Sequence, residues 1–120
     1  MDYVDGFVAA VKRRNEDAFA ATARLLAEIF LAHGATEVTD CWGDDVPDGV
    51  LTSFPMAVRR EPDEAVVFGW VRWPSAAART AGWEGAMADP RMPPNDALPF
   101  DGKRMIYGGF RTIQTARAGA

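Results

Sequence analysis

The sequence has little of several features that mark particular protein classes. Cys41 is the only cysteine among the 120 residues, so no internal disulfide can form, as is usual in a reducing cytosol. No apolar run approaches the about 20 residues that a membrane-spanning helix needs. The first residues, MDYVDGFVAAVKRR, place their charges after the apolar run, which is not the order of a secretory signal. We therefore expect a cytoplasmic protein with no membrane partner.

Basic charge is also scarce. The 13 Lys and Arg residues are outnumbered by 17 Asp and Glu residues, which gives a net charge of −4. This balance argues against binding nucleic acid over a broad surface, although a local basic patch stays open. The apolar content of 48% and the charged content of 25% are ordinary for a soluble globular protein. The length predicts one domain over residues 1–120.

Motifs of common enzyme chemistry are missing as well. The sequence has no Gly-rich phosphate loop, no zinc-ligand spacing and no Ser in a G-x-S-x-G context. His33 is the only histidine. It ends a predicted helix, where it would interact favourably with the helix dipole, and a role as general base or haem ligand is the alternative. We predict no metal site and no cofactor.

The sequence from Glu64 to Trp73, EAVVFGWVRW, predicts the central β-strand. It is rich in Val, Phe and Trp, follows Pro62 and ends at Pro74. One face of this strand carries Ala65, Val67, Gly69, Val71 and Trp73, and the other carries Val66, Phe68, Trp70 and Arg72. Both faces are mostly apolar, so we expect both to be covered.

The remaining elements follow from periodicity and helix capping signals. The predicted strands are Tyr3–Val11, Glu37–Trp42 and Lys103–Thr115, the predicted helices are Asn15–His33 and Ser75–Asp89, and Leu51–Arg60 is expected to be extended. The order β-α-β-β-α-β predicts an α+β, ferredoxin-like fold with a four-stranded antiparallel sheet. Right-handed crossovers place both helices on one face and leave the opposite face bare.

Three occupants could cover the bare face: a second copy of the chain, RNA or a small molecule. Phe68 and Trp70 would form a dimer face in the first case and would stack on bases in the second. Residues 68–73 resemble the end of the third-strand signature of RRM domains. Val66 and Val67, however, replace the basic residue and the glycine that open that signature, so the dimer is the favoured interpretation.

Long strings of this chain also resemble a known family. They are YVDGF (3–7), HGA (33–35), DDVPDG (44–49), TSFPMAV (52–58), VVFGW (66–70), MADPRM (87–92) and PFDGKRMIYGGF (99–110). The chain is similar to the YbaA-like family of uncharacterised bacterial proteins. The resemblance implies a homodimeric α/β barrel in which two ferredoxin-like sheets pack face to face. It implies no established activity.

Polar residues on apolar strands are the candidates for a site. Asp5 and Tyr107 are the candidate catalytic residues, because they could bind a polar molecule or transfer a proton if they converge. The alternative is that Asp5 forms an ion pair, with Arg111 for instance. Asp44 and Asp45 could bind a ligand or a hard cation, although aspartates beside Pro and Gly are commonly turn residues. Arg104 completes the candidate ligand-binding set.

The function predicted from the sequence is binding, with or without conversion, of a small metabolite in a cleft near the sheet of a dimer. This prediction rests on analogy with other proteins of the fold, and the sequence does not decide whether the protein is an enzyme. A non-catalytic interaction module is the alternative, and RNA binding through Phe68 and Trp70 is the third possibility.

Overall fold

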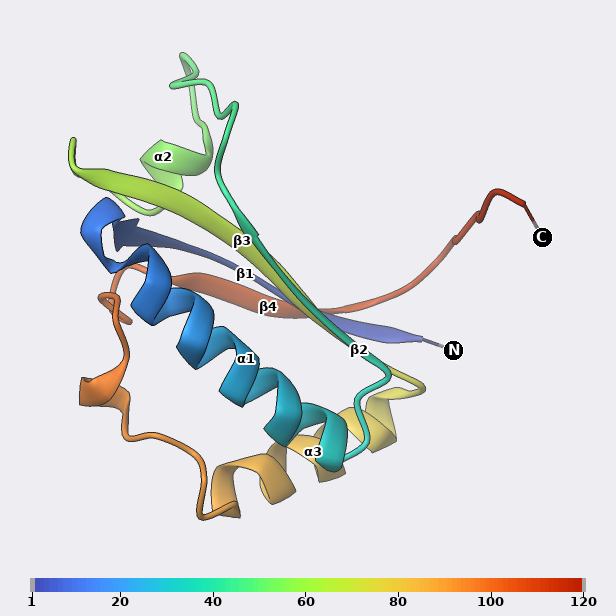
Figure 1. The fold of residues 1–120 in the computed structure, drawn as a ribbon. Coiled ribbons are helices and arrows are strands. Elements are labelled where there is room, and N and C mark those ends of the chain that lie inside the picture. The colour runs from blue at the N-terminus through green and yellow to red at the C-terminus, as the bar shows by residue number, and fades with distance from the viewer. Residues whose placement is uncertain (1, 120) are drawn as a thin grey trace.

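The computed structural model describes residues 2–119, which form a four-stranded sheet with helices packed against it (Figure 1). In chain order the elements are β1 (Tyr3–Lys12), α1 (Glu16–Ala32), β2 (Glu37–Trp42), α2 (Phe54–Ala57), β3 (Glu64–Trp73), α3 (Ala76–Ala88) and β4 (Ile106–Arg111). The strands lie in the order β2-β3-β1-β4, and each neighbouring pair is antiparallel. The predicted ferredoxin-like α+β fold is therefore confirmed.

Helices α1 and α3 lie on the same side of the sheet, which we call the helix face (Figure 1). Phe19, Ile29 and Phe30 recur at helical spacing along α1 and are buried against the sheet. Their partners on the helix face are Ala9, Val11, Val67, Val71 and Trp73. This apolar contact positions α1, because burying each large side chain stabilises the fold by about 2 kcal/mol.

The opposite side of the sheet, which we call the open face, carries the alternate residues of the same strands. They are Val4, Gly6, Val8 and Ala10 of β1, Val66, Phe68, Trp70 and Arg72 of β3, and Ile106, Gly108 and Phe110 of β4. Val8, Ala10 and Val66 are buried beneath Val58 and Val46 at one end. Elsewhere Phe68, Ile106 and Phe110 remain 43%, 44% and 63% exposed. The open face is thus apolar and only partly covered.

The segment 51–60 corrects the prediction of an extended piece. It contains the short helix α2, because Ser53 accepts a hydrogen bond from the Met56 backbone N–H at 3.1 Å and Pro55 fits the first helical turn. Helix α2 lies on the open face, where the rings of Phe54 and Phe68 are 5.9 Å apart. The connection between β2 and β3 is therefore a partial cover for the sheet and not an additional strand.

Several predicted boundaries are close to the observed ones, and β4 is the exception. It ends at Arg111 because Arg111 pairs with Tyr3, the first residue of β1; beyond this pair, one backbone bond joins the Thr112 N–H to the Asp2 carbonyl. Asn15 occupies the N-cap of α1, but its side chain makes no capping bond, since a 3₁₀ turn leads into the helix. None of the helices within residues 2–119 has the length and apolarity to cross a membrane.

Two glycines that weaken α3 as a helix are explained by close packing. A Cβ at Gly82 would collide with the Trp73 indole, and one at Gly85 would collide with the His33 ring. Glycine costs about 1 kcal/mol relative to alanine within a helix. Here the absence of a side chain at both positions allows α3 to pack closely against the end of β3 and the end of α1.

A buried ion pair fixes the start of β3. Glu64 is 2% exposed, and Arg104 donates two hydrogen bonds to its carboxylate at 2.8 and 2.7 Å. The Glu61 backbone N–H adds a third bond at 2.7 Å, and Arg104 also donates to the Arg59 carbonyl. The hydrogen bonds to the Glu64 carboxylate, of which that from Arg104 has the largest effect, lower the pKa of Glu64 from 4.5 to about 2. The pair joins the segment before β4 to the sheet.

Glu64→Gln should remove an acid-sensitive part of the folding stability. Because the pKa of Glu64 is lowered in the folded state, its contribution is complete above about pH 5 and is lost as the pH falls toward 2. The contribution has an upper limit of about 3 kcal/mol. Urea unfolding followed by circular dichroism at several pH values measures it.

The matched control is Glu61→Gln, which removes only the exposed ion pair of Glu61 with Lys12 and should leave the pH dependence nearly unchanged. Equal pH dependence of unfolding in Glu64→Gln and wild-type protein would contradict the assignment.

Candidate functional site

The carboxylate of Asp5 is the centre of a polar cluster on the helix face. Its Oδ2 accepts hydrogen bonds from the indole Nε1 of Trp73 and of Trp83, each at 2.9 Å. Arg79 donates through Nη2 to Oδ1 at 2.8 Å and through Nε to Oδ2 at 3.1 Å. The Asp5 side chain is only 12% exposed. Its two oxygens are therefore occupied by donors from β3 and α3.

Arg79 is held firmly but remains accessible on one side. Its Cζ lies 5.5 Å from the ring centroid of Tyr3 and 5.9 Å from that of Trp83. The hydrogen bonds to Asp5 raise the pKa of Arg79, which keeps the guanidinium charged. Among residues 2–119 its Nη1 donates no hydrogen bond, and the side chain is 34% exposed. Arg79 thus offers a fixed positive charge and an unused donor.

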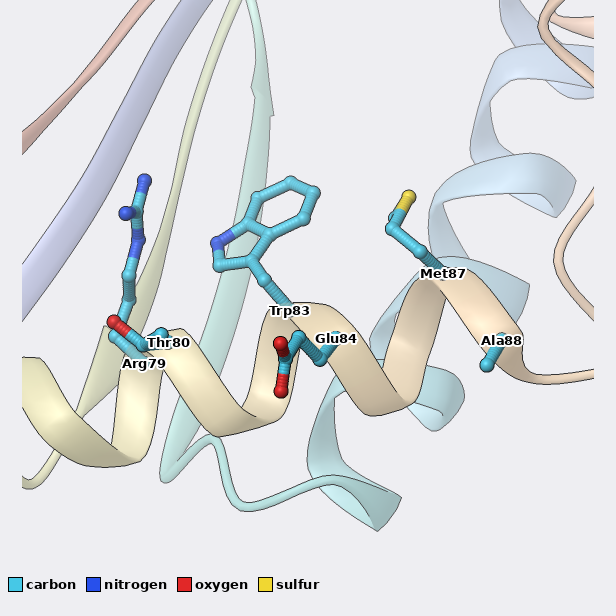
Figure 2. A pocket seen from close by; sticks show the side chains of 6 residues that line it. All are labelled: Arg79, Thr80, Trp83, Glu84, Met87 and Ala88. Atoms are coloured by element: carbon cyan, nitrogen blue, oxygen red, sulfur yellow. The ribbon is translucent and has the colours of Figure 1, made fainter.

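A shallow hollow of about 580 Å³ runs along α3 beside this arginine. Its lining residues are Arg79, Thr80, Trp83, Glu84, Met87 and Ala88. Figure 2 shows Arg79, Trp83 and Met87 pointing to the same side of the helix, as their spacing of four residues requires. Met87 is exposed, whereas Trp83 also packs against the ring of Phe30. Both side chains supply apolar surface to the hollow.

Tyr107 lies on the helix face but outside this cluster. It pairs with Phe7 in the β1–β4 ladder, and Gly109, two residues further along β4, pairs with Asp5. The Tyr107 side chain is 77% exposed. Tyr107 and Asp5 therefore share a face, at a diagonal cross-strand position, without forming a hydrogen bond. The alternative interpretation, that Asp5 forms an ion pair, is confirmed, and within the described residues its partner is Arg79 in place of the Arg111 named as an example.

The other candidate ligand-binding residues lie in different places. Arg104 is committed to Glu64, as described above, and hydrogen bonding to that carboxylate raises its pKa. Asp44 and Asp45 lie in the exposed connection between β2 and α2. Within residues 2–119 no group of three or more His, Cys, Asp or Glu side chains is arranged to hold a metal ion. The structure does not bring these residues together with Asp5.

His33 has a structural partner. It caps the C-terminus of α1, and its Nε2 lies 2.9 Å from Oδ2 of Asp89 at the end of α3. Arg91 donates to the same carboxylate at 2.8 Å, and this bond is the largest cause of the lowered pKa of Asp89. The group ties the two helix ends together.

A second hollow of about 300 Å³ lies between α1 and β2, where Phe19, Trp42 and Asp40 are among the lining residues. Although the Asp40 side chain keeps contact with solvent, desolvation by the surrounding protein raises its pKa. Asp40 makes no ion pair within the described residues, and Arg24 lies at the same hollow.

Phe68 and Trp70 both lie on the open face, with ring centroids 5.7 Å apart. The nearby base on this face is Arg72, which pairs with Asp2 and Glu37 at 3.2 Å each. The Trp70 indole also donates to Glu37. The surroundings of Phe68 and Trp70 are thus acidic and apolar. They favour contact with a protein surface over contact with RNA, whose phosphates are attracted to basic side chains.

Sequence reasoning missed Arg79, Trp73 and Trp83 as site residues. Trp73 was considered only as a face residue of the central strand, and neither Trp83 nor Arg79 was singled out. The available signal was the i, i+4 pair of Arg79 and Trp83 on a helix that follows a strand ending in Trp73. Asp5 and Arg79 are 74 residues apart in the sequence, so local patterns did not predict the contact between them.

Comparison of sequences with known proteins gives a family and no activity. A family described as "Protein of unknown function (DUF1428)" matches residues 2–102. The "Uncharacterized protein YbaA" of Escherichia coli K12 is 49% identical over 114 residues, which cover 94% of this chain and 97% of that protein. The YbaA-like resemblance predicted from the sequence is confirmed.

Comparison of structures supports the fold. SnoaB of Streptomyces nogalater, described as a cofactor-independent oxygenase, aligns with a TM-score of 0.53 and 16% identity over 95% of each chain. A Bacillus cereus protein described as a candidate antibiotic biosynthesis monooxygenase aligns with a TM-score of 0.56 and 13% identity, over 99% of this chain and 98% of that one. At these identities the likeness concerns the fold alone.

Asp5→Asn should destabilise the protein strongly for an isosteric change. The new amide N–H₂ group would face indole and guanidinium donors, and leaving a buried donor unpaired costs about 1–3 kcal/mol. Urea unfolding at neutral pH measures the loss. The control is Asp2→Asn, which removes a more exposed ion pair with Arg72 and should have little effect. Equal stability of the two variants would show that the Asp5 cluster is not a structural centre.

Proposed function

This chain belongs to the DUF1428 family of uncharacterised bacterial proteins, and we propose that it binds a small molecule with an anionic group and an apolar, planar body. The proposed site is the hollow along α3. The observation that carries the proposal is the state of Arg79: charged, fixed by Asp5, flanked by two aromatic rings and open to solvent through Nη1.

Electrostatics favours an anion with a matching shape. The Nε and Nη2 donors of Arg79 are occupied by Asp5, and the unused Nη1 presents a charged donor that suits a carboxylate or a phenolate oxygen. Asp5 neutralises part of the charge and also prevents the side chain from moving, so little conformational entropy is lost when a ligand binds. Glu84, on the same helix, makes the rim less attractive to larger polyanions.

The rest of the hollow favours an apolar body. Trp83 and Met87 offer an aromatic ring and a thioether, and both suit contact with a flat ring system. In this proposal Asp5 is a positioning residue, because its oxygens are occupied. Tyr107 remains the candidate for proton transfer, since it lies on the same face with an exposed side chain. SnoaB, whose fold this chain shares, is an oxygenase; conversion of the ligand here is an extension of the proposal.

Titration calorimetry with 2-naphthoate as the probe tests the site. We expect binding to wild-type protein and a loss of about tenfold or more in affinity in Arg79→Gln, because the anion loses its charged partner. The neutral probe 2-naphthamide should bind wild-type protein correspondingly weakly, which tests the same interaction without any mutation.

The matched control is Arg24→Gln on α1, for which no ion pair is found in the described residues. Circular dichroism verifies the fold of each variant, and Arg79→Lys restores the charge without the guanidinium. The site proposal is wrong if the two probes bind wild-type protein equally, or if neither binds.

We also propose that the protein is a homodimer that pairs through the open face. The support is the partly exposed apolar surface of Phe68, Ile106 and Phe110, a kind of surface that marks interaction sites on soluble proteins. The exposed, unpaired thiol of Cys41 suits a reducing compartment, and we place the dimer in the cytoplasm.

Light scattering on a sizing column should give about twice the chain mass of 13.1 kDa. Phe68→Asp should return the mass to that of one chain, because a buried unpaired carboxylate opposes association. Leu31→Asp, an exposed apolar position on α1, is the control and should stay dimeric. A wild-type mass of one chain would refute the dimer.

A further inference from the structure

We propose that residues 49–52, which we call the arm, reach across the dimer and cover the bare end of the partner's open face. The two sheets would then face each other with their ends exchanged, so that each copy supplies the cover that the other lacks. This inference rests on the proposed homodimer and adds the arrangement of its two copies.

The two ends of the open face are unlike. At the end where β1 finishes and β3 begins, Val8, Ala10 and Val66 are buried by Val58 and Val46 of the same chain. At the other end, Val4 pairs with Phe110 in the ladder and Trp70 lies on β3 beyond Phe68. Among residues 2–119 no helix covers that second end, and Phe110 is 63% exposed. One chain therefore leaves this end of its own face bare.

The arm carries apolar residues that have no place within its own chain. Val50 is 92% exposed and Leu51 is 96% exposed. The connection projects beyond the sheet before it returns to α2, on the side opposite α1 and α3 (Figure 1). The contact of Phe54 with Phe68 anchors the base of this projection to the open face. The apolar tip thus stands next to the surface on which a partner would dock.

The sheet alone offers a modest area for a stable dimer. Four strands about 4.8 Å apart, which run from Tyr3–Lys12 and Glu64–Trp73 down to the shorter Glu37–Trp42 and Ile106–Arg111, present roughly 500 Å² in projection. A stable interface buries about 800 Å² of accessible surface on each partner. Since α2 already covers one end of the face, a contribution from the arm brings the contact closer to that size.

Two-fold symmetry then selects the arrangement. If like ends met, α2 of one copy would lie against α2 of its partner and hold the bare ends apart. If unlike ends meet, the covered end of each copy fills the space over the bare end of the other, and the contact is repeated by symmetry. Leu51 of one copy accordingly approaches Phe110 of the partner subunit.

Cysteine cross-linking distinguishes the two arrangements. In a Cys41→Ser background, Leu51→Cys and Phe110→Cys chains with different tags are co-expressed and treated with a short bis-maleimide. We expect a cross-linked dimer that contains both tags. Leu51→Cys expressed alone should give no cross-linked product, because two arms do not meet. Self-cross-linking of Leu51→Cys without the mixed product would overturn the inference.

A second measurement does not depend on cysteine chemistry. Leu51→Asp should weaken the dimer by about tenfold or more in sedimentation equilibrium, because it places a charge against an apolar surface. This position is exposed in the single chain, so the fold should persist. Leu31→Asp is the control. If Leu51→Asp leaves the dimer unchanged while Phe68→Asp dissociates it, the arm inference fails and the dimer stands; a monomeric wild type removes the dimer itself.

Discussion

The carboxylate of Asp5 is the interaction on which the arrangement of the helix face depends. It joins β1 to the last residue of β3 and to the middle of α3 through two indoles and a guanidinium. All three partner side chains donate hydrogen bonds, and the two oxygens of Asp5 accept them. Removing the acid would leave the indole N–H groups of Trp73 and Trp83 and the Arg79 guanidinium without their shared acceptor. The Asp5 cluster therefore positions α3 and the hollow beside Arg79, together with the close packing at Gly82 and Gly85.

The alternation of apolar residues was sufficient to predict the sheet, and it was insufficient to predict the cluster. The ladder pairs Asp5 with Val71 and Gly109, and Val71 lies on the face predicted for it in β3. Local patterns also predicted the cap of α3 at Ser75. They missed α2, where Ser53 and Pro55 outweigh the extended tendency of the neighbouring residues. They also missed Arg79, because a contact between residues 74 positions apart depends on tertiary geometry. They missed the two indole hydrogen bonds because a tryptophan in a sequence pattern is counted as an apolar residue, and its N–H donor is not considered.

The two faces of the sheet have different chemistry, and the proposals divide accordingly. The helix face combines a fixed charge with aromatic surface, which suits a small anionic ligand. The open face is apolar around Phe68 and Trp70, and the neighbouring Arg72 is neutralised by Asp2 and Glu37. Because the sheet separates them, a partner could dock on one face without blocking the other.

The segment between α3 and β4 is anchored at both ends. At its start Asp89 binds His33 and Arg91, and at its end Arg104 binds Glu64. Between Pro93 and Leu98 the chain is largely exposed and makes only a short 3₁₀ turn. A loop with two independent anchors tolerates a change of length between them, since closing a longer loop costs little entropy. This stretch is therefore a place where a peptide tag or a reporter domain could be inserted without disturbing either face of the sheet.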